Sequence, residues 1–121
     1  MSAASNYLED KLLDHTLGNT AFTQPSTLYV GLFTGTPNTN LEAGTLTDEV
    51  SGGSYTRKAV TFGAASSGSA SNSATVTFDT ATANWGTITS VAVLDASSNG
   101  NVLFYGSVTS SKTIESGDTF Q

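Results

Sequence analysis

The sequence predicts a mainly β protein: an antiparallel β-sandwich or jelly-roll-like domain with one N-terminal amphipathic helix. Thr, Ser, Gly and Asn make up nearly half of the 121 residues, which suits half-exposed strands joined by polar turns. Short apolar runs separated by such turns fill most of the chain, and one stretch near the start has a helical pattern. We expect residues 1–121 to form a single domain, with a docking helix at 6–17 and the β-sandwich at 27–121.

Charge and composition exclude several classes of partner. Only 12% of the residues are charged and the net charge is −6. Four scattered basic residues cannot line a nucleic-acid backbone. The start of the chain lacks a secretory signal, and no apolar run approaches the roughly 20 residues that span a bilayer. The sequence therefore predicts neither nucleic-acid nor membrane partners, and the absence of cysteine excludes a disulfide framework.

Residues 6–17 form the predicted helix. Asn6 is the expected N-cap, and Gly18 is the expected stop signal. We expect the leucines to share one face and the acids to point away, so that the helix docks onto an apolar surface. That surface belongs either to its own β-domain or to a neighbouring subunit. The expected contact residues are Leu8, Leu12, Leu13 and Leu17.

The middle of the chain alternates between predicted strands and loops. Residues 27–34 predict a central strand, because both alternating faces of the run are apolar. The long polar segment 35–53 is an expected mobile loop. Residues 54–62 predict a second strand, the small-residue segment 63–73 a second mobile loop, and residues 74–79 a short strand.

The strand at 54–62 carries the only basic doublet, Arg57 and Lys58. Adjacent side chains of a strand point to opposite faces. One of the two can pair with the acidic segment 42–49, of the same chain or of another subunit. Alternatively, both lie on a solvated edge strand, where positive charge deters unwanted pairing. We regard both as candidate protein contacts.

The segment around the single tryptophan is the richest in β-forming residues. Trp85-Gly86 precedes a buried strand at 87–94, and residues 95–101 form a turn in which Asn99-Gly100 favours a left-handed backbone. A second strand at 102–108 completes a hairpin, and a further short strand is expected at 111–114.

Trp85 has two interpretations. As a structural anchor, Trp85 with Gly86 fixes the preceding loop to the core. As an exposed platform, it stacks on a sugar ring, with Asn84 and Asp79 as polar partners.

Residues that could carry chemistry are few. His15 is the single histidine, without a nucleophile motif around it. The acids Glu42, Asp48 and Glu49 match no calcium-loop spacing. We therefore expect no catalytic residues, no cofactor and no metal site.

Several segments together resemble a family of small structural proteins of tailed bacteriophages and prophages, often labelled tail-fibre proteins. These segments are YLEDKLLDHTL at 7–17, LYVGLFTGT at 28–36, EVSGGSYTRKAVTF at 49–62, ANWGTITSVAVLD at 83–95, NVLFYG at 101–106 and SGDTF at 116–120. The resemblance implies a virion protein without catalytic activity. It also implies one more apolar strand after the last segment, which is either contributed from elsewhere or missing because the sequence is clipped.

The size of the chain favours one role within the virion. It has room for one domain and lacks the heptads or repeats of an elongated shaft. We expect a capsid decoration (cement) protein, a homo-oligomer and preferably a trimer, bound to the major capsid protein or other virion proteins. The alternatives are a small tail-fibre or tail-adaptor subunit and, in a different class, a carbohydrate-binding module that uses Trp85.

Overall fold

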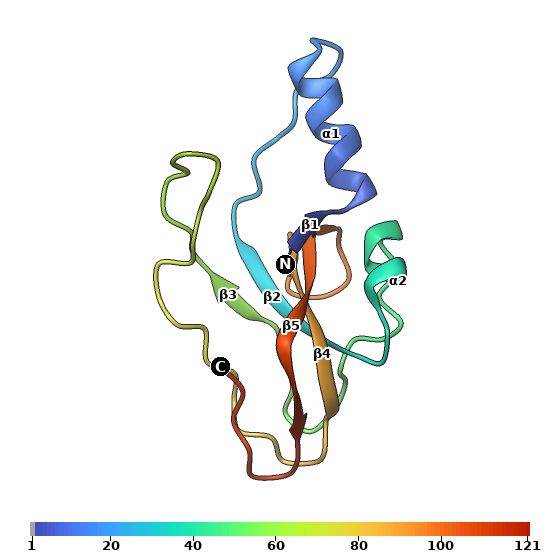
Figure 1. The fold of residues 1–121 in the computed structure, drawn as a ribbon, viewed down its shortest axis with the longest axis vertical. Helices are drawn as coiled ribbons and strands as arrows, with labels where there is room; N and C mark the ends of the chain where they lie inside the picture. Colours follow the sequence, from blue (N-terminus) through green and yellow to red (C-terminus); the bar gives the residue numbers. More distant parts are fainter. Residues whose placement is uncertain (1) are drawn as a thin grey trace.

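The computed structural model describes residues 2–121 and shows a five-stranded antiparallel sheet with two helices (Figure 1). The elements are β1 (Ser2–Ala4), α1 (Asn6–Thr16), β2 (Leu28–Thr34), α2 (Asn38–Ala43), β3 (Lys58–Val60), β4 (Gly86–Leu94) and β5 (Val102–Ile114). The order of strands in the sheet is β1-β5-β4-β2-β3. The predicted mainly β, antiparallel fold with an N-terminal helix is confirmed.

The hairpin of β4 and β5 is the longest pairing in the sheet, and its predicted turn is confirmed. Asn99 and Gly100 have φ angles of 53° and 73°, the left-handed values that such turns require. The Asp95 carboxylate closes the turn by accepting from the backbone N–H of Asn101 at 2.7 Å and from its Nδ2 at 2.9 Å. The turn sequence therefore sets the register of the two central strands.

A large bulge interrupts this hairpin. Ser90 pairs with Ser107, but Ile88 pairs with Lys112, so residues 108–111 stand opposite Thr89 alone. Bulges re-aim side chains and increase strand twist. Ile88 accordingly packs in a different apolar cluster from Ala92.

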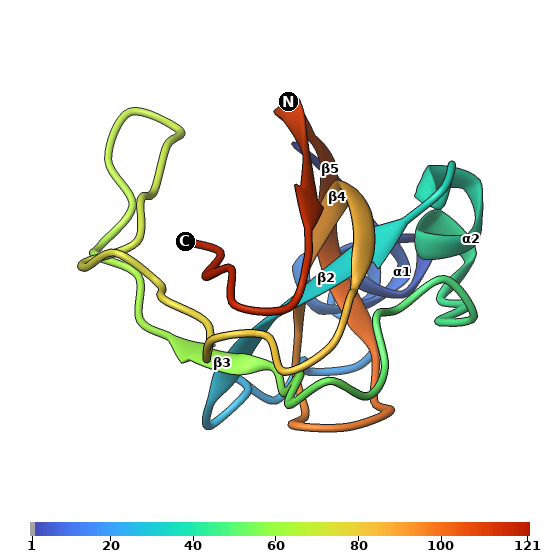
Figure 2. The same ribbon diagram turned by 90° about the horizontal axis from the view of Figure 1, so that it is seen from below.

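The two faces of the sheet carry separate apolar clusters. One contains Leu32, Trp85, Ile88 and Ile114, together with parts of the irregular segments before and after β4 and β5. The other contains Phe33 and the buried Leu41 of α2, with residues of β4 and β5. Figure 2 shows segment 61–80 and the C-terminal residues on one side of β4 and β5, and α2 on the other. The layers that cover the sheet are thus irregular chain and a short helix.

Two predicted boundaries change at the ends of elements. Ser5, rather than Asn6, is the N-cap of α1: its hydroxyl accepts from the backbone N–H of Leu8 at 3.2 Å. At the other end of the chain, the strand expected at 111–114 is the last part of β5. Gly18, with a φ of 78°, follows the end of the helix as predicted.

Three predictions for the middle of the chain are wrong. Segment 35–53 contains the helix α2 instead of being loop throughout. Of the strand expected at 54–62 only Lys58–Val60 forms, because left-handed φ angles at Gly52, Gly53 and Ser54 turn the chain just before it. Residues 74–79 form no strand: Phe78 is buried, but its backbone N–H donates to the carbonyl of Phe120 at 2.9 Å instead of joining a ladder.

Candidate interaction surfaces

Arg57 lies in a buried polar network. Its Nε and one terminal nitrogen donate to the two carboxylate oxygens of Glu49 at 2.7 and 2.8 Å. The other terminal nitrogen donates to the carbonyls of Ala96 and Asn99 at 2.7 and 2.8 Å. The Arg57 and Glu49 side chains are only 3% and 17% exposed. The network therefore fastens the segment before β3 to the β4–β5 turn.

The Tyr55 hydroxyl extends this network into the sheet. It donates to Oε1 of Glu49 at 2.8 Å and accepts from the backbone N–H of Leu32 at 2.9 Å. Burial raises the pKa of the Tyr55 phenol, the Leu32 bond opposes that rise and the Glu49 charge adds to it. Burial alone would lower the pKa of Arg57, but the hydrogen bonds and charge of Glu49 outweigh it and raise that pKa.

The two residues of the basic doublet have different environments. Arg57 pairs within its own chain with an acid of the 42–49 segment. The Nζ of Lys58 lies 2.9 Å from Oδ1 of Asp79, where the two side chains are 27% and 58% exposed. As candidate contacts with a partner, Lys58 is accessible and Arg57 is enclosed.

Trp85 lies in the core and is 6% exposed. Its indole Nε1 donates to the carbonyl of Gly53 at 2.9 Å, and its ring meets that of Tyr55 edge-on at 5.5 Å. A Cβ at Gly53 would approach Nε1 to 2.8 Å, so this close contact requires glycine. Gly86, with a φ of 92°, starts β4 directly after the indole. Because the indole ring of Trp85 is enclosed in this way, a sugar ring has no room to stack on it.

The leucines of α1 do not share one face. Leu8 is 5% exposed and packs toward the sheet, whereas Leu12, Leu13 and Leu17 are 44%, 56% and 78% exposed. At about 100° per residue, Leu13 and Leu17 are rotated about 140° and 180° away from Leu8. Leu13 and Leu17 follow Leu8 by five and nine residues, and these spacings place them on the side of the helix opposite Leu8. We call Leu12, Leu13 and Leu17 the leucine surface.

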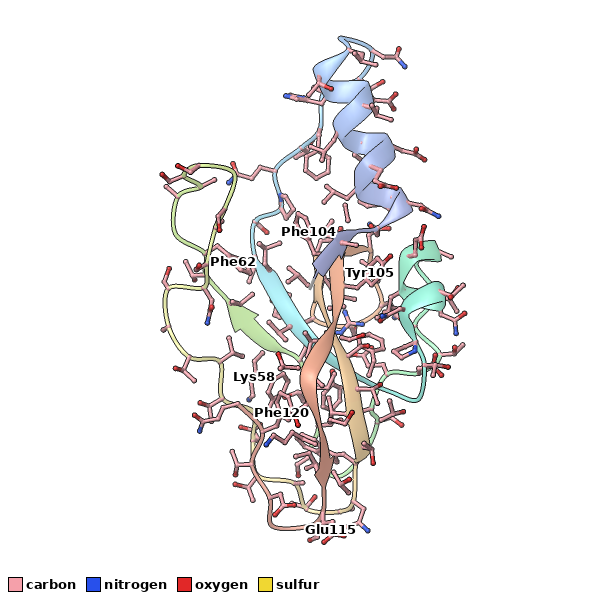
Figure 3. All side chains as sticks on the ribbon, viewed as in Figure 1. Lys58, Phe62, Phe104, Tyr105, Glu115 and Phe120 are labelled. Carbon is pink, nitrogen blue, oxygen red and sulfur yellow. The ribbon has the colours of Figure 1, made fainter. Side chains whose placement is uncertain are left out.

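A second, partly exposed apolar surface lies on the sheet. One hollow of about 310 Å³ is lined mainly by apolar side chains of β2, β3 and the segments before β4 and after β5, and a second of about 330 Å³ lies over β2, β4 and β5. The two adjoin at Val30, and Phe62 and Phe104 at their margins are 37% and 45% exposed (Figure 3). We define the apolar sheet face as Val30, Val60, Phe62, Val91, Val93 and Phe104.

Sequence reasoning did not identify the apolar sheet face as a candidate site. Val93 and Phe104 occupy adjacent positions on β4 and β5, with Val30 of β2 beside them. Their strand pattern predicts burial, and nothing in the sequence shows that the covering segments leave them open.

Segment 61–73 forms a narrow arm beside this face (Figure 2). Phe62 pairs with Asn72 at its base, and Ser66 pairs with Ser69 at its tip. Every residue from 63 to 73 is exposed. The arm is thus a hairpin-like projection of small side chains.

The residues considered for chemistry have local structural partners. Nδ1 of His15 accepts from the backbone N–H of Phe22 at 3.1 Å, and Asp48 accepts from Asn40 at 3.0 Å. Within residues 2–121 no group of three acids or histidines is arranged to hold a metal ion. None of the helices described there has the length and apolar character needed to cross a bilayer.

Comparison with known proteins identifies the family of the chain. No curated protein matches it. Residues 3–121 match the family model described as Podophage GP4 fiber I protein gp80. Because this match covers nearly the whole chain, the protein belongs to that family of small tailed-phage structural proteins, labelled as fibre proteins.

Proposed function

We propose that the protein is a non-enzymatic subunit of a phage tail fibre or of the adaptor that attaches one. The observation that carries this proposal is the match of residues 3–121 to a phage fibre family. The family description favours a position on the tail. The size of the chain alone had favoured the capsid exterior.

The structure supports a role that depends on contact with other proteins. The chain has two separate apolar surfaces, the exposed leucine surface and the partly exposed apolar sheet face. Large exposed apolar patches on a soluble protein commonly mark interaction sites. The expected partners are other virion proteins and further copies of the chain.

Capsid decoration is the second candidate. The observation that favours it is the compact arrangement of the chain. The described residues, 2–121, contain one five-stranded sheet and two helices, and they contain no repeated or coiled-coil shaft. A decoration protein needs only a compact domain with anchors for the shell.

The abundance of the protein in purified particles distinguishes the two. Quantitative mass spectrometry measures its copy number relative to the major capsid protein and to the portal. We expect a ratio near that of the portal and other tail components. A copy number comparable to that of the major capsid protein would overturn the tail assignment in favour of decoration, and absence from particles would remove both.

A further inference from the structure

The turn between β4 and β5 contains a chemically reactive dipeptide, Asn99-Gly100. The side-chain amide of an asparagine is open to attack by the backbone nitrogen of the next residue, which closes a succinimide ring. This attack is least hindered when the next residue is glycine, because glycine has no Cβ beside the attacking nitrogen. Each of the other seven asparagines precedes a residue that has a side chain. Asn99 is therefore the asparagine whose sequence context favours this reaction.

The structure leaves both reacting groups free. Asn99 and Gly100 are exposed in the connection between β4 and β5, which lies at the lower edge of Figure 2. Within residues 2–121, neither the side-chain amide of Asn99 nor the backbone N–H of Gly100 makes a hydrogen bond. The last paired residues of the hairpin are Leu94 and Val102, so Asn99 can rotate toward the Gly100 nitrogen without breaking the ladder.

Two other asparagines show the contrast. The Nδ2 of Asn101 donates to Oδ2 of Asp95 at 2.9 Å, and that of Asn72 donates to the carbonyl of Ala74 at 2.7 Å. These bonds hold the two amides in place, and a residue with a side chain follows each of them. Asn101 and Asn72 therefore serve as internal controls for Asn99.

We propose that Asn99 is a self-modification site, at which the turn converts asparagine to isoaspartate without an enzyme. The Gly100 nitrogen loses its proton to a solvent base and attacks Cγ of Asn99. The bond from Cγ to Nδ2 breaks, and ammonia leaves after taking up a proton. Water then adds to one of the two carbonyl carbons of the ring and breaks the bond from that carbon to the Gly100 nitrogen. Attack at Cγ yields aspartate, and attack at the main-chain carbonyl carbon yields isoaspartate, in which the chain continues through Cγ.

Arg57 favours the second of these products. One terminal nitrogen of its guanidinium donates to the main-chain carbonyl oxygen of Asn99 at 2.8 Å. This bond stabilises the negative charge that develops on the oxygen when water attacks its carbon. Attack there also turns a neutral carbonyl into a carboxylate, which is a stronger partner for the guanidinium. The Arg57 side chain is only 3% exposed, so solvent screens its charge weakly.

Isoaspartate changes the connection that sets the register of β4 and β5. It inserts one carbon atom into the main chain between Asn99 and Gly100, and it adds one negative charge to a chain whose net charge is −6. We therefore expect the aged protein to unfold at a lower temperature than fresh protein. The inference does not depend on the proposed function, because the reaction needs only the chain and water.

Peptide mapping by mass spectrometry tests the site. Purified protein is stored at mildly alkaline pH, which speeds loss of the amide proton, and isoaspartate is detected by enzymatic methylation of its free carboxylate. We expect isoaspartate to accumulate at Asn99 while the other seven asparagines stay at background. The matched control is Asn99→Gly, since glycine keeps the left-handed turn, and this variant should accumulate none.

Two results would overturn the proposal. One is an Asn99 that stays unchanged in the folded protein after the same residue has reacted in protein unfolded by urea, since the turn would then protect it. The other is faster reaction at Asn72 in the exposed arm, which would show that exposure alone decides which asparagine reacts.

The ratio of isoaspartate to aspartate tests the part assigned to Arg57. We expect a higher ratio in folded wild type than in urea, where the guanidinium no longer contacts Asn99. Arg57→Met should lower the ratio toward the unfolded value, and the matched control Lys58→Met should leave it unchanged, with circular dichroism to confirm that both variants are folded. If Arg57→Met does not fold, the comparison within wild type decides. Equal ratios in folded and unfolded wild type contradict the effect of Arg57.

Discussion

At the scale of single residues, the Arg57–Glu49 pair shows what the sequence implied about pairing and what it left open. The sequence left two alternatives open, a pair between one basic residue and the 42–49 segment or a solvated edge strand, and the structure pairs Arg57 with Glu49. The buried member also bonds two turn carbonyls, a contact that no sequence pattern predicts.

The first prediction compares the two members of the basic doublet. Arg57→Met leaves the Glu49 carboxylate largely buried without its cation, so we expect it to lower the free energy of unfolding by about 2–3 kcal/mol, somewhat less than for a fully buried pair. The matched control Lys58→Met removes an exposed ion pair and should cost at most about 1 kcal/mol. Urea unfolding of both variants measures the difference. Equal losses would show that the burial of the network contributes nothing.

The second prediction concerns alkaline pH and Tyr55. Its folded-state pKa is raised by burial and by Glu49, so its contribution to stability is complete below the ordinary tyrosine pKa of roughly 10 and is lost as the pH rises above it. Up to about 1.4 kcal/mol per pH unit is lost there, since the unfolded chain ionises and the folded chain does not. Tyr55→Phe should reduce this slope.

Unfolding free energies measured from neutral to strongly alkaline pH give the two slopes. Wild type and Tyr55→Phe should run parallel below roughly pH 9 and diverge above it. Parallel curves over the whole range would mean that Tyr55 loses its proton as readily in the folded protein as in the unfolded chain.

At the scale of elements, the third prediction tests the start of α1. Ser5→Ala removes the N-cap bond to Leu8 and leaves the carbonyl of Val102 without its hydroxyl partner, so we expect a loss of about 2 kcal/mol. Asn6→Ala, at the position that the sequence favoured as the cap, should change stability by less than about 0.5 kcal/mol. Thermal unfolding of both variants decides between them. A larger loss of stability in Asn6→Ala than in Ser5→Ala would show that Asn6 is the N-cap, as the sequence predicted.

The elements that sequence predicts well are those with local signals. The hairpin of β4 and β5 follows from its Asn99-Gly100 turn and from the aliphatic run before it, and the end of α1 follows from Gly18. The strand expected at 74–79 fails because its apolar residues are buried by distant partners, with Phe78 bonded to Phe120. Burial and strand pairing produce the same local pattern, so the sequence alone does not separate them.

For the candidate surfaces, too, the sequence indicates which side chains are apolar but not which of them distant segments cover. Four leucines within residues 6–17 indicate a docking helix, but their spacing carries Leu13 and Leu17 away from Leu8, and only the structure shows which ones stay exposed. The apolar sheet face was missed because Val93 and Phe104 belong to the strand pattern of a core. Whether that face is covered depends on the path of segment 61–80, and the apolar alternation at Val76 and Phe78 does not show where this segment runs.

At the scale of the whole molecule, charge opposes association between copies. Each copy carries a net charge of −6, so copies repel one another at low ionic strength, whereas the two candidate surfaces consist of apolar side chains. The fourth prediction is that association between copies strengthens as salt rises to physiological levels, where screening acts within about 8 Å. Light scattering over a series of salt concentrations measures this. Weaker association at higher salt would instead indicate contact through ion pairs.

The tip of the arm offers a practical handle on where the protein sits in the particle. Ser67 and Gly68 turn the chain with φ angles of 52° and 76°, closed by reciprocal backbone bonds between Ser66 and Ser69 of 2.8 and 3.0 Å. Exposed tips of small residues tolerate inserted sequence. A short antibody epitope placed between Ser67 and Gly68 should leave the unfolding temperature unchanged. Gold-labelled antibody would then mark the protein's position on intact virions by electron microscopy, without disturbing either apolar surface.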